Sequence, residues 1–347
     1  MPVAVGEVDK ARRARRFELA SWRRANAIRL DSKGAASCMR AHGDVSVAVS
    51  TAGQAHIGGG IARCGSIASC PTCGPVMRER RAIEIDEACQ AHLAQGGTVW
   101  LVTLTVPHSC TDAFLDVLDR LQDLYRDTFS GRSGRQLRKD LDVVGLIRAW
   151  DITYGVRNGW HPHMHVLFFA QGDRFNGQAL CAAWEAGFTA RGYDYVPTVS
   201  ADFRQVNVTD GASGYVAKAD GGWGAGLELA RTDLKRGVGM TPQQLLELAS
   251  TGEARWVRLW AEYEKGMFRR RVIQWTPGLR KRLGLGEIAT DEQAAEGLAP
   301  DEVVCVLLVT RTTWNRYRQA GQLARLLQLL EGGQLPDGVY GCTGDPP

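Results

Sequence analysis

The sequence predicts an α+β fold whose strands pair in an antiparallel sheet. Four β-branched and apolar stretches, at residues 98–106, 143–153, 163–169 and 203–208, alternate with helical segments, but without the strand–helix–strand cadence of a parallel sheet. The turn-rich sequence GVRNGW joins the second and third stretches, which are therefore expected to form a hairpin. A group of closely spaced cysteines precedes the strands and predicts a small metal-binding module.

Composition and hydropathy exclude several classes of protein. The chain has 347 residues, 44% of them hydrophobic and 23% charged, so it is long enough for two domains and is not disordered, collagen-like or coiled coil as a whole. Its apolar runs are far shorter than the roughly 20 residues of a membrane-spanning helix. The Arg-rich first thirty residues lack the apolar core of a secretory signal. We expect no membrane association and a cytoplasmic location.

Helices are expected where apolar residues recur at helical spacing and end signals are present. Residues 77–95 have this spacing and stop at Gly96-Gly97, and residues 111–129 read as an amphipathic helix. A further helix is expected near residues 179–191, and Thr241-Pro242 marks a helix start, with the cap before a proline in the first turn.

Composition also divides the chain into six segments. They are a basic N-terminal segment (1–30), a Cys-rich zinc module (31–77), a mixed central domain (78–225), a helical basic extension (226–285), a candidate small winged-helix-like unit (286–331) and a Gly/Pro-rich tail expected to be disordered (332–347).

The cysteines predict a structural zinc site. Three of them fall in the segment CGSIASCPTCG: Cys64, Cys70 and Cys73. The two-residue gap that ends this segment is typical of zinc knuckles, and a tetrahedral zinc needs a fourth ligand. Cys38 is the leading candidate, with His42 and His56 behind it. The alternative is a chance grouping of buried free cysteines.

The sequence GWHPHMHVLFF predicts a second, catalytic metal site. On a strand, His161, His163 and His165 project from one face, where imidazoles can hold one cation. Asp151, on the partner strand, is the expected third ligand, because a carboxylate added to two imidazoles suits Mg or Mn and leaves positions open for a phosphate oxygen. The alternative is that Asp151 orients an imidazole N–H.

The segment SGYVAKAD places Tyr215 and Lys218 three residues apart, on one face of an expected helix. Alone, this spacing is a weak signal, because a helical tyrosine is more often packed than catalytic. Its position after the LVTLTV strand and the His strand gives it weight.

Taken in order, these motifs resemble the HUH endonucleases, specifically the single-tyrosine replication initiators of rolling-circle plasmids in Gram-positive and actinobacterial hosts. The first motif corresponds to LVTLTVP (Leu101–Pro107), the second to GWHPHMHVLFF with His163 and His165 as its core, and the third to GYVAKAD. The Cys segment and the run from LARTDLKRG to TPGLRKRLGL are also similar, so the resemblance covers roughly residues 36–285.

The resemblance implies a palm-like α+β nicking domain at residues 78–225. Its central antiparallel sheet would carry His163 and His165 on a middle strand, with helices packed on one side and the helix of Tyr215 facing the metal. In this family the enzyme nicks one strand at a plasmid origin.

The resemblance also implies the chemistry. Tyr215 would attack a phosphodiester that the metal held by His163, His165 and Asp151 activates. The enzyme would keep the 5′-phosphate as a phosphotyrosine and free a 3′-OH to prime the host polymerase. Lys218 would assist the phenolate or clamp a phosphate. Single-stranded and origin DNA, with host helicase and polymerase, are the partners implied.

One position departs from the family pattern. Some members carry a Glu four residues before the tyrosine that activates water at termination, but this chain has Gly211 there and Asp210 as the nearest acid. Asp210 would reach a phosphotyrosine only if the helix begins after it. Its alternative role is to cap that helix, as Ser213 also could.

Two basic segments, residues 10–29 and 265–282, are candidates for DNA contact because each concentrates Lys and Arg with almost no acid. Two alternatives to a nicking initiator remain. One is a relaxase or transposase of the same superfamily, and the other is a non-catalytic DNA-binding regulator that uses the Cys module and the basic segments.

Overall fold

The computed structural model describes residues 5–32, 34–172, 174–206, 239–296 and 302–341. The chain divides into two compact units, each assembled from separate stretches. The first unit comprises Met1–Arg80, Leu246–Lys265 and Ala289–Pro347, and the second comprises Arg81–Leu245 and Gly266–Ile288.

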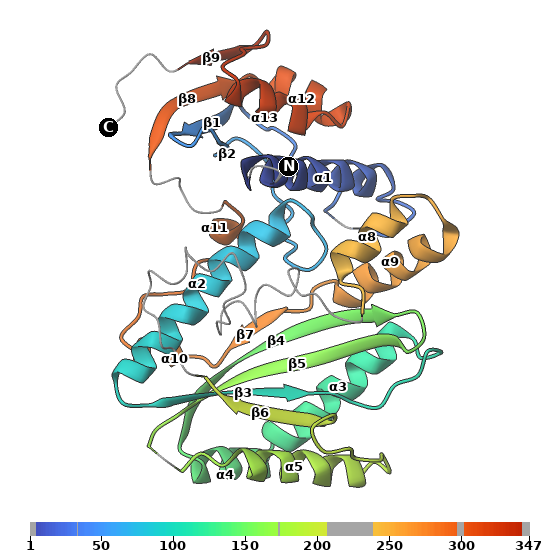
Figure 1. Cartoon of the computed structure of the whole chain (residues 1–347), viewed down its shortest axis with the longest axis vertical. Helices are drawn as coiled ribbons and strands as arrows, with labels where there is room; N and C mark the ends of the chain where they lie inside the picture. The colour runs from blue at the N-terminus through green and yellow to red at the C-terminus, as the bar shows by residue number, and fades with distance from the viewer. Residues whose placement is uncertain (1–4, 33, 173, 207–238, 297–301, 342–347) are drawn as a thin grey trace. The chain divides into compact units, whose positions relative to one another are not determined.

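The first unit is built on a four-stranded antiparallel sheet in the order β2-β1-β8-β9. Its strands are β1 (Val45–Ser50), β2 (Ala55–Ile57), β8 (Val303–Val309) and β9 (Val339–Gly341). Its helices are α1 (Val5–Ala25), α11 (Asp291–Glu296), α12 (Arg311–Gln319) and α13 (Leu323–Glu331), and it also holds the first turns of α2 (Cys73–Ala94) and most of α9 (Ala254–Met267) (Figure 1).

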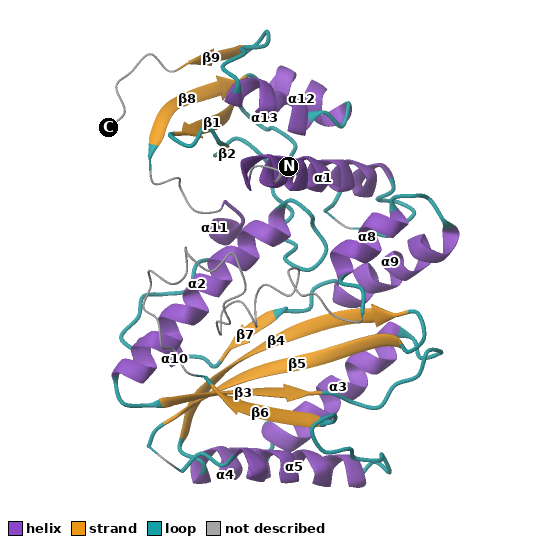
Figure 2. Ribbon diagram, in the orientation of Figure 1, coloured by secondary structure: helices purple, strands orange, loops and turns teal. Residues whose placement is uncertain are grey.

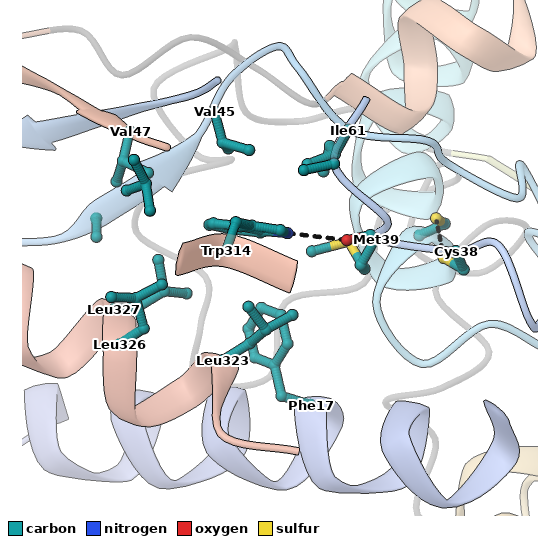
Figure 3. Packing of buried hydrophobic residues seen from close by; sticks show 14 of the residues in the cluster. Phe17, Cys38, Met39, Val45, Val47, Ile61, Trp314, Leu323, Leu326 and Leu327 are labelled. Carbon is teal, nitrogen blue, oxygen red and sulfur yellow. Dashed lines mark hydrogen bonds between the residues drawn. The ribbon is translucent and has the colours of Figure 1, made fainter. Parts of the chain in front are cut away.

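Trp314 lies at the centre of the core of the first unit (Figure 3). It is fully buried, and its indole Nε1–H donates to the carbonyl oxygen of Met39 at 2.8 Å. The aliphatic face of α13 and Phe17 of α1 close the same core. Burial of an apolar residue of this size contributes about 2–3 kcal/mol, so α12 is fixed to the chain segment beside Cys38.

The second unit contains a five-stranded antiparallel sheet in the order β6-β3-β5-β4-β7. Its strands are β3 (Thr98–Leu104), β4 (Val143–Gly155), β5 (Gly159–Ala170), β6 (Ala201–Gln205) and β7 (Ile273–Trp275). Its helices are α3 (Phe114–Phe129), α4 (Arg132–Asp140), α5 (Gly177–Thr189) and α10 (Leu279–Arg282), together with the later turns of α2 and the start of α8 (Pro242–Ala249).

Helices cover both faces of this sheet (Figure 2). One face packs against α2 and α10 through a cluster of apolar residues: Ala82, Ile85, Ala88, Cys89, Val99, Leu101, Ile147, Ala149, Leu167, Phe169, Leu279 and Leu283. The other face packs against α3 and α5, where the ring centroids of Phe129 and Phe168 are 6.0 Å apart. The resemblance implied helices on one side and the helix of Tyr215 facing the metal. The structure adds α2 and α10 on the face that carries the histidine side chains, and the segment of Tyr215 lies outside the described residues. Successive residues of β5, such as Leu167 and Phe168, are both apolar, so both faces need cover.

The elements expected between residues 77 and 206 are confirmed, with shifts of a few residues at their ends. The hairpin is present as β4 and β5, and β5 is a middle strand. The helix start at Thr241 is also present. Its hydroxyl accepts from the Gln244 N–H at 3.3 Å, while the Gln244 side chain accepts from the Thr241 N–H at 2.8 Å.

Two expectations about the end of the chain need correction. Residues 286–331 contain the expected strand and two helices, but β8 pairs with β1 along its length, so this region shares a sheet with the Cys-rich module. The tail at 332–347 is not disordered throughout, because Val339–Gly341 pair with β8 as β9. Local composition, on which the six-segment division rests, carries no information about the pairing of strands that are distant in the sequence. The other boundaries of that division stay predictions.

The turn of the β4–β5 hairpin requires glycine. Gly159 pairs with Gly155 at the end of the ladder and has a φ of 75°. A Cβ at this position would lie 2.8 Å from the Cα of Cys110 and 2.9 Å from the Ser109 carbonyl oxygen. The hairpin end is thus packed directly against the backbone that follows β3.

Gly159→Ala is expected to lower the free energy of unfolding by more than about 2 kcal/mol, because the left-handed conformation alone costs roughly 1–2 kcal/mol and the methyl group would overlap the Cys110 backbone. Gly192→Ala is the matched control, since Gly192 has a φ of 69° but open space around it. Urea unfolding of the two variants measures the difference. Equal destabilisation would show that the close packing does not matter.

Candidate functional site

The histidines of β5 and the acid of β4 share one face of the second sheet. His161, His163 and His165 alternate along β5, so their side chains project to the same side. The hairpin register pairs Asp151 with His163, and directly opposite residues of an antiparallel pair lie on the same face. In β3, the other strand that pairs with β5, Thr103 lies opposite His165.

His165 is held between two oxygen atoms. Its Nε2 lies 3.3 Å from Asp151 Oδ2, and its Nδ1 lies 3.0 Å from Thr103 Oγ1. His165 and Asp151 are each 4% exposed. Neighbouring ligands of an octahedral cation with bonds of about 2.1 Å lie about 3.0 Å apart. The pair therefore fits joint ligation of Mg or Mn, and it equally fits a hydrogen bond that orients the imidazole.

His163 lies between the other two imidazoles of the strand. Its ring is parallel to that of His165, with centroids 6.1 Å apart and an interplanar angle of 4°, and it meets the His161 ring edge-on at 4.2 Å. Within the described ranges, the four cysteines are the one group of three or more ligand atoms that converge within 4.8 Å. Joint ligation by His163 and His165 requires their rings to turn toward each other.

Sequence reasoning missed a fourth histidine. His108 follows β3, and its Nε2 lies 2.9 Å from His161 Nδ1. Burial, followed by the proximity of His108, lowers the pKa of His161 to about 4, so His161 is neutral near pH 7. The signal in the sequence is the position of His108 directly after the LVTLTVP motif.

The four predicted cysteines converge on one point. Their Sγ atoms all lie within 4.8 Å of one another. Cys38 Sγ is 3.7 Å from both Cys70 and Cys73, and Cys64 Sγ is 3.9 Å from Cys73. A tetrahedral zinc with bonds of about 2.3 Å separates its thiolates by about 3.8 Å. This donor set fits zinc, and the alternatives His42 and His56 are not part of the cluster.

The electrostatics around the cysteines favour a bound cation. Hydrogen bonding from Cys38 lowers the pKa of Cys70 well below its usual range and raises that of Cys64 and Cys73. Some of these thiols therefore stay protonated unless a metal ion balances the negative charge. The Cys73 N–H also donates to Cys70 Sγ at 3.3 Å, as expected for a knuckle turn.

Arginines from distant parts of the chain approach the cysteine cluster. Arg318 of α12 donates through Nε to the Cys38 carbonyl oxygen at 2.9 Å, and Arg24 of α1 donates to the Arg318 carbonyl oxygen at 3.4 Å. Burial, followed by the like charge of Arg318, lowers the pKa of Arg24 to about 10. Four thiolates around one zinc carry a net charge of −2, which these guanidinium groups complement.

The basic segments expected to contact DNA are partly used inside the protein. In residues 10–29, Arg13 pairs with Glu331 and Arg23 pairs with the buried Glu264. In residues 265–282, Arg270 pairs with Asp119, Arg280 with Glu87, and Arg282 donates to the Val144 carbonyl oxygen at 3.2 Å. These arginines are structural, so the basic segments hold fewer side chains that could contact DNA, among them the exposed Arg12, Arg269 and Arg271.

Three predicted site residues, Tyr215, Lys218 and Asp210, lie outside the described residues. None of the described helices combines the length with the apolar sequence that a bilayer-spanning helix needs.

Two curated proteins from Streptomyces are similar to this chain. It is 30% identical over 303 aligned residues to "Protein rep" of Streptomyces lividans, with 67% of this chain and 66% of that protein covered. The match thus spans just under two thirds of the length of that relative. It is 32% identical over 152 residues to "Neomycin resistance protein" of Streptomyces cyanogenus, with 37% of this chain and 35% of that protein covered. No protein-family profile matches the chain, and neither does any solved structure.

The cysteine geometry predicts about one zinc per chain in the purified protein. Cys70→Ser is expected to lower zinc content and the midpoint of thermal unfolding, because it removes a ligand from a closed four-thiolate shell. Cys305→Ser is the control, since Cys305 is exposed and outside the cluster. Elemental analysis and thermal unfolding measure both. Folded protein without zinc would contradict the assignment.

Proposed function

We propose that this protein initiates rolling-circle replication of a plasmid as a single-tyrosine endonuclease of the HUH superfamily. It nicks one strand at the origin, keeps the 5′ end of that strand and leaves a 3′-OH as a primer. The similarity to "Protein rep" supports the role in replication. The observation that carries the chemistry is the row of histidines on β5 facing Asp151, with His165 Nε2 3.3 Å from Asp151 Oδ2.

The proposed metal ligands are His163, His165 and Asp151, with His161 as a weaker fourth candidate. When bound, Mg or Mn would neutralise charge on the scissile phosphate. The ligand side chains of β4 and β5 hold their donor atoms on one face of the sheet, where β5 is paired with β3 on one side and β4 on the other. Thr103 contributes by fixing the ring of His165 through the contact at 3.0 Å.

Tyr215 is the proposed nucleophile. Its phenol loses a proton as the oxygen attacks the scissile phosphorus, the bond from phosphorus to the 3′ oxygen breaks, and that oxygen takes up a proton to become the 3′-OH. A phenol with a pKa near 10 is a weak nucleophile at neutral pH. Lys218, three residues further along the chain, is proposed to stabilise the phenolate or to bind a neighbouring phosphate.

Asp210 caps the helix of Tyr215 or activates water to release the covalent DNA, and the absence of a Glu at position 211 leaves it as the nearest acid. Single-stranded and origin DNA are the proposed ligands, and host helicase and polymerase are the proposed partners. The zinc module is proposed to be structural.

Tyr215→Phe is expected to abolish nicking while DNA binding and the fold survive, because the substitution removes only the hydroxyl group. The test incubates wild type and variant with labelled single-stranded oligonucleotides from the element that encodes the protein and looks for a covalent adduct on a denaturing gel. Tyr193→Phe, which removes a phenol elsewhere in the chain, is the control. An adduct on the Tyr215→Phe variant would place the nucleophile elsewhere, and no adduct even with wild type would favour a DNA-binding regulator.

Removal of the catalytic cation is expected to stop nicking without releasing the structural zinc, since the two sites differ in donor type. Dialysis against EDTA followed by Mg or Mn should restore cleavage while zinc stays near one per chain. His163→Ala and His165→Ala are expected to eliminate cleavage, His161→Ala to reduce it less, and His42→Ala, at an exposed position, to have no effect. Full activity of the His165→Ala variant would exclude this cation site.

A further inference from the structure

A chain of hydrogen bonds links the backbone after β3 to the histidine row. The Val106 carbonyl oxygen lies 3.3 Å from His108 Nδ1, and His108 Nε2 lies 2.9 Å from His161 Nδ1. None of the sequence motifs includes His108. We propose that His108 is a positioning residue that fixes the tautomer of His161, so that His161 presents an unprotonated Nε2 to the divalent cation. That a divalent cation binds here rests on the function proposed above.

The tautomers follow from the order of donors and acceptors. A carbonyl oxygen accepts only, so His108 Nδ1 carries the proton and donates to Val106. In a neutral imidazole the other nitrogen is then an acceptor, so His108 Nε2 receives the hydrogen bond from His161 Nδ1–H. His161 Nε2 is left with a lone pair, which is the form that binds metal ions.

The loop that carries His108 is fixed by contacts of its own. The Ser109 N–H and hydroxyl donate to the Asp112 carboxylate at 3.1 and 3.0 Å. Arg120 of α3 donates to the same carboxylate at 3.2 Å and also to the Pro107 carbonyl oxygen. Gly159 lies against the backbone of Cys110 on the other side. His108 is therefore held on a braced loop next to the end of the hairpin.

The position of His161 makes its tautomer matter. Its ring meets the His163 ring edge-on, with centroids 4.2 Å apart, so both imidazoles border the same space on the sheet face. A hydrogen-bonded partner on the far nitrogen of a ligating histidine fixes ring orientation and raises basicity, and its loss typically weakens metal binding about 10–100-fold. His108 supplies that partner without contacting the cation.

The test compares two substitutions at one position. His108→Gln retains a side-chain carbonyl oxygen that can accept from His161 Nδ1–H, whereas His108→Leu removes the acceptor. Cys110→Ser, at an exposed position of the same loop, is the control. Long-range ¹H–¹⁵N spectra of histidine-labelled protein, with His161 assigned through His161→Ala, report which ring nitrogen carries the proton. Mn²⁺ affinity is measured by electron paramagnetic resonance.

We expect His161 to be protonated on Nδ1 in wild type, in His108→Gln and in Cys110→Ser, and to lose this preference in His108→Leu. Mn²⁺ binding should weaken about tenfold or more in His108→Leu and recover in His108→Gln. Protonation of His161 on Nε2 in wild type would overturn the proposal, as would equal Mn²⁺ affinity in the Leu and Gln variants.

The two readouts separate this inference from the proposed function. The spectra are recorded on the full chain without Mn²⁺, so they report the tautomer whether or not the protein cleaves DNA. A wild type that lacks Mn²⁺ binding but shows the Nδ1–H tautomer, sensitive to His108→Leu, would refute the cation site and leave the positioning of His161 by His108 intact.

Discussion

The candidate site depends above all on the register between β4 and β5. Their ladder runs from Val143 opposite Ala170 to Gly155 opposite Gly159, and it places Asp151 opposite His163. Because side chains alternate along a strand, a slip of one residue would move the three histidines to the face that packs against α3 and α5. The left-handed turn at Gly159, which lies against the Cys110 backbone, opposes such a slip. Register thus decides whether acid and imidazoles meet.

Several arginines of the two basic segments form ion pairs within the protein, so they stabilise the fold. Arg23 illustrates this. It donates to Glu264 at 2.9 Å and to Ser69 at 3.2 Å, and the same Glu264 accepts from Trp260 at 3.1 Å. Removing one partner of a buried pair costs about 3–5 kcal/mol, so this arginine ties α1 to α9 and to the knuckle loop. A basic segment in the sequence is consequently a poor guide to a DNA-binding surface.

Local patterns predicted the local elements of this fold and failed where distant segments meet. The hairpin and the face shared by the histidines follow from strand periodicity and a turn. The grouping of Cys64, Cys70 and Cys73 around one point follows from their spacing in the sequence. The pairing of β8 with β1 leaves no local signal, because both strands read simply as apolar and β-branched. His108 was missed for a related reason. Its importance comes from a 2.9 Å contact across 53 residues, which only the packed structure brings about.

The cysteine cluster also depends on contacts between segments that are distant in the sequence. The knuckle is local, but the segment that carries Cys38 is held by α12, through Trp314 on the Met39 carbonyl oxygen and Arg318 on the Cys38 carbonyl oxygen. Bringing α12 to the segment of Cys38 closes a long loop of chain. The entropy lost in closing a loop grows only slowly with the number of residues, so a few buried contacts and one bound metal ion can offset it. A metal ion bound by the four cysteines would couple its affinity to the folding of the first unit, because α12 holds the segment that carries the fourth thiolate.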